Sequence, residues 1–426
     1  PMVFLLISLG MGVSVAGSVL VAQYTGADRQ RGAEYAASQT VTFAVIASLV
    51  LGGAGYLFVD RFLAIMGASD AVLPLATSYM EVISLGLVFM FGFAVFVALM
   101  RGYGDTITPM VVMFGSVVLN IVLDPFLIFG WTLVENAPLV GTITFPELGI
   151  QGAAVATVFS RALALFVGLA IMFRGTRGVE IHLRDMVPDL GYFGRLVRIG
   201  LPASIEGTGR ALSMNLLLFI VAMFPDPVVA AYGIGTRVFS VVFLPATAVA
   251  RGVETMTGQN IGADKPDRAR RAARLAVTFL FGVLSVIGLV VFLAPEPIVS
   301  VFVGAGQENA EQVIAVGTTF LRYVALTFGF IGILRAYTGS FRGAGETLTA
   351  AAIAVVTLGV VRFPVAWIGA DAIGETGIWF AFAISNVAGA AIAYAWHRRG
   401  TWREGTLTDA TIKTEELGTE PTPTDD

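Results

Sequence analysis

The sequence predicts an all-α polytopic membrane protein, and three observations support this fold class. Of its 426 residues, 56% are hydrophobic and only 13% are charged, whereas soluble domains average about 25% charged residues. Apolar runs long enough to cross a bilayer recur along almost the whole chain. These runs are continuous and do not alternate with polar residues, so they indicate helices rather than the strands of a barrel.

We expect eleven spanning helices, placed by the polar turns that bound them. The first half contributes 2–24, 36–60, 73–100, 107–130 and 149–174. The second half contributes 196–223, 228–256, 272–294, 313–341, 347–369 and 374–397. The remaining segment 404–426 is rich in Thr, Glu and Asp, and is predicted to be a disordered acidic tail.

Basic residues outside the predicted helices lie almost entirely on one side of the membrane, and this bias predicts the orientation. That side holds 18 Lys and Arg residues, whereas the opposite side holds only Arg61. We therefore expect a multi-pass cell-membrane protein whose C-terminus is cytoplasmic. Eleven helices then place Pro1 outside, so a twelfth helix is expected to be missing before it.

An internal repeat relates the two halves. Residues 23–43, which begin QYTGAD, align without a gap to 259–279, which begin QNIGAD. Two further matches follow in the same order, namely RGYGDTIT with RGAGETLT and GIQGAAVA with GETGIWFA. A duplication of this kind predicts two pseudo-symmetric six-helix bundles related by an axis along the membrane normal. Residues 1–190 would form the first bundle, with five of its helices and a cytoplasmic linker, and 191–403 the second.

One polar pair interrupts the apolar segment 107–130. Asn120 and Asp124 are four residues apart, so on a helix their side chains share a face. A charge near the bilayer centre costs about 2.5–3.5 kcal/mol on insertion scales, and such residues usually face a cavity, a partner or an ion path. Pro125 follows, lacks an N–H and frees the carbonyl oxygen of Ile121. These residues predict either a proton or Na⁺ site or a structural kink with a satisfied acid, and leave both open.

The second half offers different candidates. Its segment VVRFPVAW places Arg362 shortly before Pro364, so a base stands where the first repeat has an acid. Glu206 and Arg210 are i, i+4 neighbours whose spacing favours an ion pair, and both are candidates for a substrate cavity. The aromatic candidates for an apolar binding cavity are Phe89, Phe93 and Phe239.

Most other ionisable residues within the predicted helices are expected to be structural. Arg251 and Glu254 lie near a predicted helix end, from which long side chains can reach the membrane interface. The turns RGYGDT and RGAGET lack the phosphate-loop pattern, so we interpret them as tight cytoplasmic turns.

Several classes of function are disfavoured. Scattered basic residues and a net charge of −4 do not suggest a nucleic-acid partner. The absence of cysteine excludes disulfides and thiolate metal sites. His182 and His397 have no second His at metal-binding spacing, and no catalytic cluster is recognisable. We therefore expect neither an enzyme nor a cofactor.

Several segments together resemble the multidrug and toxic compound extrusion (MATE) family of transporters. These segments are the two QxxGAD turns, the two RGxGD/ET turns, AAYGIGTRVFSVVFLPATAVA at 230–250, GLPASIE at 200–206 and NIVLDP at 120–125. The resemblance covers roughly residues 1–397. It implies two bundles arranged in a V around a central cavity, in a protein that exchanges a cation for an exported compound.

NIVLDP resembles the branch related to the DNA-damage-inducible F proteins. That resemblance implies a Na⁺ or H⁺ site inside the first bundle, with Asn120 and Asp124 as ligands and Thr157, in GAAVAT, as a third. It also implies an Asp on the first helix of the family, which is the helix expected to be missing. The implied function is antiport of organic, cationic or amphipathic compounds by a lipid-embedded monomer, with no cofactor besides the coupling ion.

Two other classes of membrane protein are alternatives to this function. A lipid-linked oligosaccharide flippase of the same superfamily would need a cationic cavity for pyrophosphate, and five arginines keep this alternative open: Arg161, Arg210, Arg237, Arg322 and Arg335. An ion channel is less favoured, because a channel tends to repeat its pore residues around an axis and Asp124 is unmatched.

Overall fold

The computed structural model describes residues 2–65, 69–137, 141–304 and 309–408. The chain forms two compact units, one containing Pro1–Val21 and Arg29–Leu201, the other Ala22–Asp28 and Pro202–Asp426. Helix α1 (Met2–Gly26) therefore begins in the first unit and ends in the second. Most of the predicted tail 404–426 lies outside the described residues.

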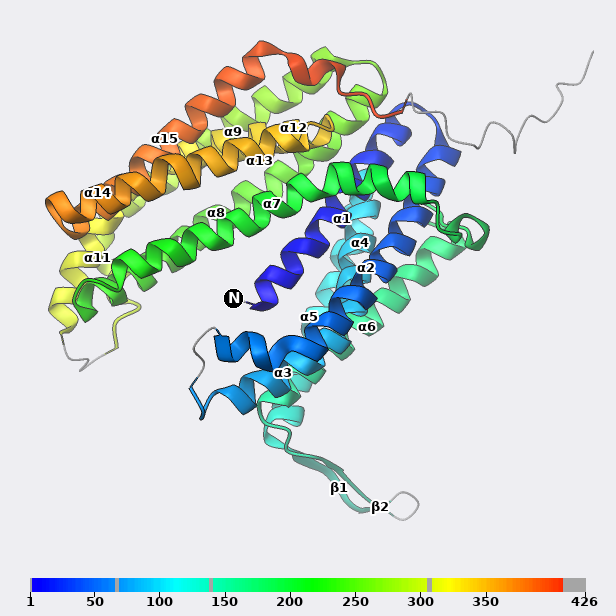
Figure 1. Cartoon of the computed structure of the whole chain (residues 1–426), viewed down its shortest axis with the longest axis horizontal. Helices are drawn as coiled ribbons and strands as arrows, with labels where there is room; N and C mark the ends of the chain where they lie inside the picture. Colours follow the sequence, from blue (N-terminus) through cyan, green and yellow to red (C-terminus); the bar gives the residue numbers. More distant parts are fainter. Residues whose placement is uncertain (1, 66–68, 138–140, 305–308, 409–426) are drawn as a thin grey trace, which may run out of the picture. The chain divides into compact units, whose positions relative to one another are not determined.

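The first unit is a helical bundle with one hairpin (Figure 1). After most of α1 it contains α2 (Gln30–Ile65), α3 (Leu73–Leu85), α4 (Leu87–Tyr103), α5 (Ile107–Phe129), α6 (Ile150–Arg174) and the short helix η1 (Leu183–Met186). Strands β1 (Trp131–Ala137) and β2 (Gly141–Phe145) connect α5 to α6 as an antiparallel pair, with Trp131 opposite Phe145. The sequence predicts only helices and connecting segments, so this strand pair is a departure, although Thr, Val, Ile and aromatic residues favour strands.

The second unit begins within α7 (Leu190–Val221), which runs through the boundary between the units. Its other helices are α8 (Asp226–Gly262), α9 (Pro266–Leu293), α10 (Pro295–Ser300), α11 (Ala310–Ala325), α12 (Phe328–Gly343), α13 (Thr347–Val355), the π-helix η2 (Val356–Arg362), α14 (Phe363–Ile373), α15 (Glu375–Arg399) and the 3₁₀ helix η3 (Thr401–Glu404). Aromatic rings pack in the core of this unit, where Phe320 and Trp379 stack with centroids 4.1 Å apart.

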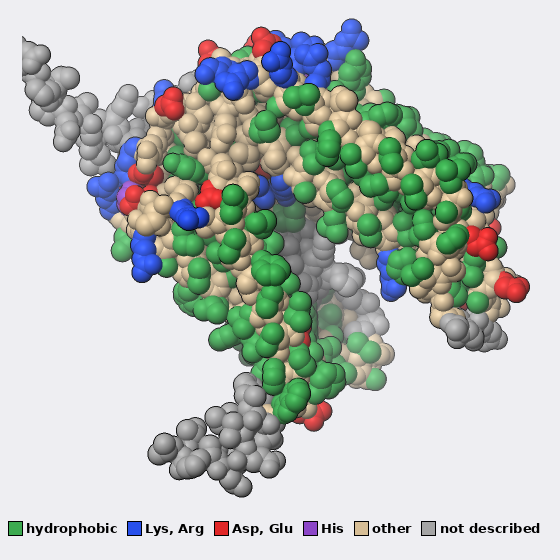
Figure 2. All heavy atoms as spheres, turned by 180° about the vertical axis from the view of Figure 1, so that it is seen from behind, with side chains coloured by type: hydrophobic (Ala, Val, Ile, Leu, Met, Phe, Trp, Pro, Cys, Tyr) green, Lys and Arg blue, Asp and Glu red, His purple; other side chains and the backbone are tan. Residues whose placement is uncertain are grey.

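The predicted all-α membrane fold is confirmed. Each of the eleven predicted ranges falls on one long helix or on consecutive helices. Among the described residues, seven helices are long and apolar enough to span a membrane, and two bent pairs pass the same test, α3 with α4 at 53° and α11 with α12 at 51°. Hydrophobic side chains are spread over much of the visible surface, as expected for a protein that faces lipid (Figure 2).

The internal repeat is visible in the backbone. Asp28 and Asp264 end the two GAD turns with φ of 55° and 54°, a left-handed conformation that few residues other than Gly adopt. In each turn the Ala N–H donates to the Gln carbonyl four residues earlier, at 3.0 Å, from Ala27 to Gln23 and from Ala263 to Gln259. The same local sequence has thus produced the same helix end twice.

The two GAD turns also contact each other. Both lie in the second unit, to which residues 22–28 belong. A Cβ on Gly26 would lie 1.9 Å from the Gln259 carbonyl oxygen, and a Cβ on Gly262 would lie 1.9 Å from that of Gln23. Only glycine permits this reciprocal approach, since real Cβ atoms essentially never come so close.

The second repeated turn, RGxG followed by an acid, caps the next helix. Asp105 accepts hydrogen bonds from the backbone N–H groups of Ile107 and Thr108, at 3.0 and 2.9 Å, at the start of α5. Burial alone would raise the pKa of Asp105, but hydrogen bonds from Thr108 and Ile107 outweigh burial and lower it. The predicted tight turn is confirmed at this position.

Candidate functional site

The first candidate site lies on α5, whose sequence is otherwise almost wholly apolar. Asn120 donates from Nδ2 to Oδ1 of Asp124 at 3.2 Å, as their i, i+4 spacing predicts. Pro125 lies inside the helix directly after the acid. Asn120 and Asp124 are both half-buried. This arrangement supplies carboxylate and amide oxygens together with a carbonyl freed by Pro125, which is a donor set suited to a hard cation or a proton.

Helix α6 packs against α5 and carries Thr157, the third predicted ligand. Ser116, four residues before Asn120 and on its face, donates from Oγ to the carbonyl oxygen of Ser160 on α6 at 3.1 Å. The Thr157 hydroxyl donates to the Ala153 carbonyl oxygen at 2.9 Å, so its lone pairs stay available to a cation.

The aromatic candidates of the first unit pack against neighbours on α4 and α6. Phe89 contacts Phe166 edge to face, with centroids 6.0 Å apart. Phe93 lies under the guanidinium of Arg161, whose Cζ is 5.1 Å from the ring centroid. The other candidates for the cavity, Glu206, Arg210 and Phe239, lie in the second unit.

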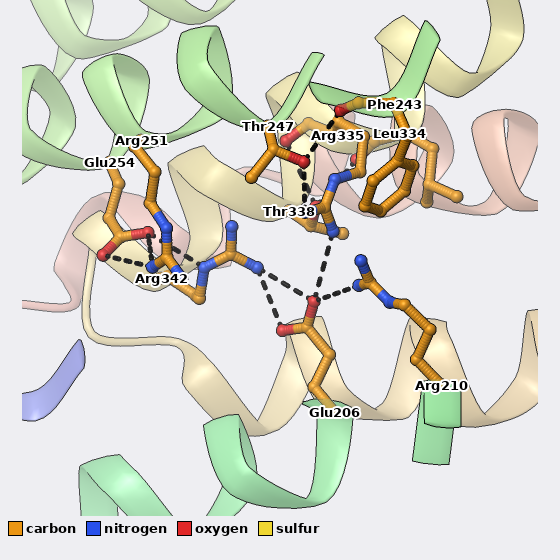
Figure 3. A network of polar contacts seen from close by, with 10 residues as sticks. All are labelled: Glu206, Arg210, Phe243, Thr247, Arg251, Glu254, Leu334, Arg335, Thr338 and Arg342. Atoms are coloured by element: carbon orange, nitrogen blue, oxygen red, sulfur yellow. Dashed lines mark hydrogen bonds and ion pairs between the residues drawn. The ribbon is translucent and has the colours of Figure 1, made fainter. Parts of the chain in front are cut away.

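The second candidate site is a buried ionic network in the second unit, drawn in Figure 3. Its central group is Glu206 on α7, whose Oε1 accepts from Arg210 at 3.1 Å and from Arg342 on α12 at 3.1 Å. Oε2 accepts from Arg342 at 2.9 Å, and Arg335 approaches Oε1 at 3.6 Å. The predicted ion pair between Glu206 and Arg210 is confirmed, but three arginines share this one carboxylate.

Helix α8 adds a second carboxylate to the network. Glu254 accepts from Arg342 Nε at 3.0 Å and from Arg251 at 3.1 Å. Arg251 and Glu254 do not lie near a helix end as predicted, because α8 continues to Gly262, and Glu254 is only 2% exposed. Arg342 begins the RGAGET segment that was predicted to be a turn, yet it lies within α12 and is 3% exposed.

An aromatic wall borders the same network. Phe243 on α8 contacts two guanidinium groups, with Cζ of Arg210 4.9 Å and that of Arg335 4.6 Å from the ring centroid. Phe239, one turn earlier, stacks on Phe243 with centroids 6.4 Å apart. These distances are typical of cation–π interactions, which keep both guanidinium groups near one ring.

Arg362, the base that replaces the acid in the second repeat, is buried in η2 and has neutral partners. Its Nε donates to Ser385 Oγ at 2.8 Å, and Nη2 donates to Asn386 Oδ1 at 3.0 Å. Its guanidinium also lies over Phe382 at 4.5 Å.

A third polar group joins the linker before α7 to α2. His182 Nε2 lies 3.1 Å from Glu34 Oε2, and Glu180 lies 3.6 Å from the other ring nitrogen. The three side chains are close enough to share a metal ion. However, Arg31 already supplies positive charge to Glu34 at 3.6 Å, so an ion-pair cluster accounts for the arrangement.

Comparison with known proteins decides the family. A family model described as MatE matches residues 1–126 and 202–368, well over half of the chain. The chain belongs to the MatE family. This MatE chain is 28% identical over 422 residues to the probable multidrug resistance protein NorM of Thermotoga maritima, covering 96% of the chain and 84% of that protein. It is 26% identical over 389 residues to an FAD transporter of Shewanella oneidensis, covering 91% and 82%.

Solved structures show the same fold. A crystal structure of MATE in complex with MaL6 matches this MatE chain with a TM-score of 0.86 at 23% identity, covering 95% of this chain and 88% of that one. A Vibrio cholerae MATE transporter, VcmN, matches with a TM-score of 0.84 at 20% identity, covering 95% and 88%. The prediction of a membrane transporter of small organic compounds, not an enzyme, agrees with this family.

Proposed function

We propose that this MatE chain is an antiporter that exports organic, cationic or amphipathic compounds by alternating access, driven by a Na⁺ or H⁺ gradient. The observation that carries the proposal is the hydrogen-bonded pair of Asn120 and Asp124 on α5. A carboxylate on so apolar a helix needs a function or a partner to offset its cost, and its described side-chain partner is a neutral amide.

The mechanism follows from the charge of Asp124. Protonation or Na⁺ binding removes the cost of a bare carboxylate, with Asn120 and Thr157 supplying further oxygens to the cation. Pro125 leaves α5 without one backbone hydrogen bond next to the acid, so the helix can bend there at lower cost. Coupling requires the ion to bind one of the two orientations of the transporter more tightly than the other.

Transport by reconstituted protein tests this function. Proteoliposomes that contain the purified protein would be loaded with ethidium, a fluorescent organic cation, while a Na⁺ gradient and a pH gradient are imposed separately. We expect ethidium movement under one gradient, and its loss in Asp124→Asn. Asp60→Asn, an exposed acid on α2 of the same unit, is the matched control and should transport normally. Movement retained in Asp124→Asn would remove this residue from the coupling mechanism.

The flippase remains the second candidate, favoured by the excess of arginine over glutamate in the ionic network of the second unit. It predicts movement of a lipid-linked pyrophosphate without ethidium transport under either gradient. For both functions we propose a monomer in the cell membrane with a cytoplasmic C-terminus, which the distribution of Lys and Arg supports.

A further inference from the structure

The ionic network of the second unit carries more positive than negative charge. It contains four arginines, at 210, 251, 335 and 342, and two glutamates, at 206 and 254. The carboxylate of Glu206 contacts three of these guanidinium groups, so its single charge cannot balance them. Buried charges are stable only when they are paired, and the two charges in excess call for anionic partners.

Hydrogen-bond donors are in excess as well. Each guanidinium has five N–H groups in a rigid fork and no acceptor. Arg335 donates to Thr247 Oγ1 at 3.1 Å, but its Nε is buried and has no hydrogen-bond partner. The Arg335 side chain is only 9% exposed, so this donor is not satisfied by bulk water. An unsatisfied buried donor of this kind indicates a missing acceptor.

The network is partly exposed at Arg210 and Arg251. Arg210 keeps 25% of its side chain exposed, whereas the Arg342 side chain is 4% exposed. Arg210 and Arg335 both border Phe243, and Figure 3 shows their guanidinium groups directed toward the same carboxylate of Glu206. A ligand that approached Arg210 would therefore meet two guanidinium forks and an aromatic ring together.

We propose that Arg210 and Arg335 bind the carboxylate or phosphate group of an amphipathic organic anion, whose apolar part lies against Phe243 and Phe239. Planar guanidinium groups bind carboxylate and phosphate oxygens through paired hydrogen bonds, which a simple cation site does not provide. The ligand neutralises the excess charge and gives Arg335 Nε an acceptor. The site differs in polarity from that of Asp124, and binding there needs no ion gradient.

Equilibrium binding to the full chain in lipid nanodiscs tests the proposal. Three probes share one ring system and differ in charge: 1-naphthyl phosphate, 1-naphthoate and 1-naphthylmethylammonium. We expect calorimetry to show binding of the two anions and none of the ammonium. Equal binding of all three, or binding of none, would overturn the proposal. Since no transport is measured, failure here is distinguishable from failure of the export function.

Substitutions at Arg210 and Arg335 test whether these two residues bind the anion. Arg210→Gln and Arg335→Gln should each weaken the affinity for 1-naphthyl phosphate by about tenfold or more, the value of a charged hydrogen bond. Arg271→Gln removes an exposed arginine on α9 of the same unit and should leave affinity within about twofold of the parent. If Arg335→Gln does not fold, the more exposed Arg210→Gln decides the question alone. Unchanged affinity in Arg210→Gln would refute the assignment.

Competition identifies the source of the anion. Nanodiscs of phosphatidylcholine would be compared with discs that also contain phosphatidylglycerol, and separately with added phenyl phosphate. If a lipid headgroup occupies the site, phosphatidylglycerol weakens probe binding by the parent but not the residual binding by Arg210→Gln. If the natural ligand is a soluble organic anion, phenyl phosphate competes and phosphatidylglycerol does not. Competition by neither, despite probe binding, would contradict a site specific for anions.

Discussion

The two units share repeated turns but differ in the charge of their interiors. The GAD turns end with Asp28 and Asp264 at nearly the same φ, 55° and 54°. Near the repeated proline, however, the first unit has Asp124 with an amide partner, whereas the second has Arg362 with a hydroxyl and an amide. Backbone geometry is fixed by a few turn residues, and interior charge is set by others. A duplicated bundle can therefore keep its fold while its two copies acquire interior charges of opposite sign.

The largest expected effect is a loss of stability when Glu206, the acid at the centre of the ionic network in the second unit, is neutralised. Glu206→Gln would leave three arginines around a neutral amide, and breaking a buried pair in this way costs about 3–5 kcal/mol. Asp124→Asn in the first unit removes a charge that has no described basic partner, and should change stability by less than about 1 kcal/mol. Thermal unfolding of both variants in detergent measures the difference.

The matched control for this experiment is Glu311→Gln, an exposed acid on α11 of the second unit. It should lower the unfolding temperature far less than Glu206→Gln does, because its charge in the first turn of α11 is worth at most about 1 kcal/mol. Equal losses in Glu206→Gln and Asp124→Asn would mean that the two acids have the same structural role, and the contrast between the units would fail.

A smaller effect is expected at Arg362. Arg362→Met removes a buried charge that has neutral partners, but leaves Asn386 Oδ1 without the hydrogen bond it accepts. Removing the buried charge stabilises the protein and losing the hydrogen bond destabilises it, so the free energy of unfolding should change by about 1 kcal/mol or less. The same unfolding measurement applies, with the exposed Arg322→Met for comparison. A loss as large as that of Glu206→Gln would show that Arg362 belongs to the ionic network.

The smallest effect compares the two repeated turns. Asp105 caps α5 through two backbone N–H groups, whereas Glu346 accepts from the side chain of Thr349 at 2.7 Å. Asp105→Asn should cost about 0.3–1 kcal/mol near neutral pH, and Glu346→Gln less. Unfolding midpoints in detergent, measured for each variant beside the parent, test this order.

The Asp105 contribution should depend on pH. Because its pKa is lower in the folded protein than in the unfolded chain, it stabilises above the unfolded pKa and is lost as pH falls through the folded value. The difference in unfolding midpoint between the parent and Asp105→Asn should therefore shrink below about pH 4. A difference that stayed constant on acidification would show that the charge of Asp105 does not stabilise α5.

The sequence predicted what depends on local patterns. Apolar runs placed the helices, the duplicated turns predicted the repeat, and i, i+4 spacing predicted the Asn120–Asp124 and Glu206–Arg210 pairs. It did not predict contacts between distant helices. Arg342 reaches Glu254, 88 residues away, and Glu206, 136 residues away. Its place in RGAGET looked like a turn, since no local pattern shows that α8 and α7 cover it.

The reciprocal contact of Gly26 and Gly262 has a consequence for biosynthesis. At about 5–20 residues per second, residues 22–28 leave the ribosome long before the QNIGAD turn that they contact in the second unit. The end of α1 thus cannot make this contact until the second half of the chain has been synthesised. A chain cut in the linker between α6 and α7 would yield a C-terminal fragment without this segment. The two halves, although duplicated, are therefore not interchangeable building blocks that mature independently.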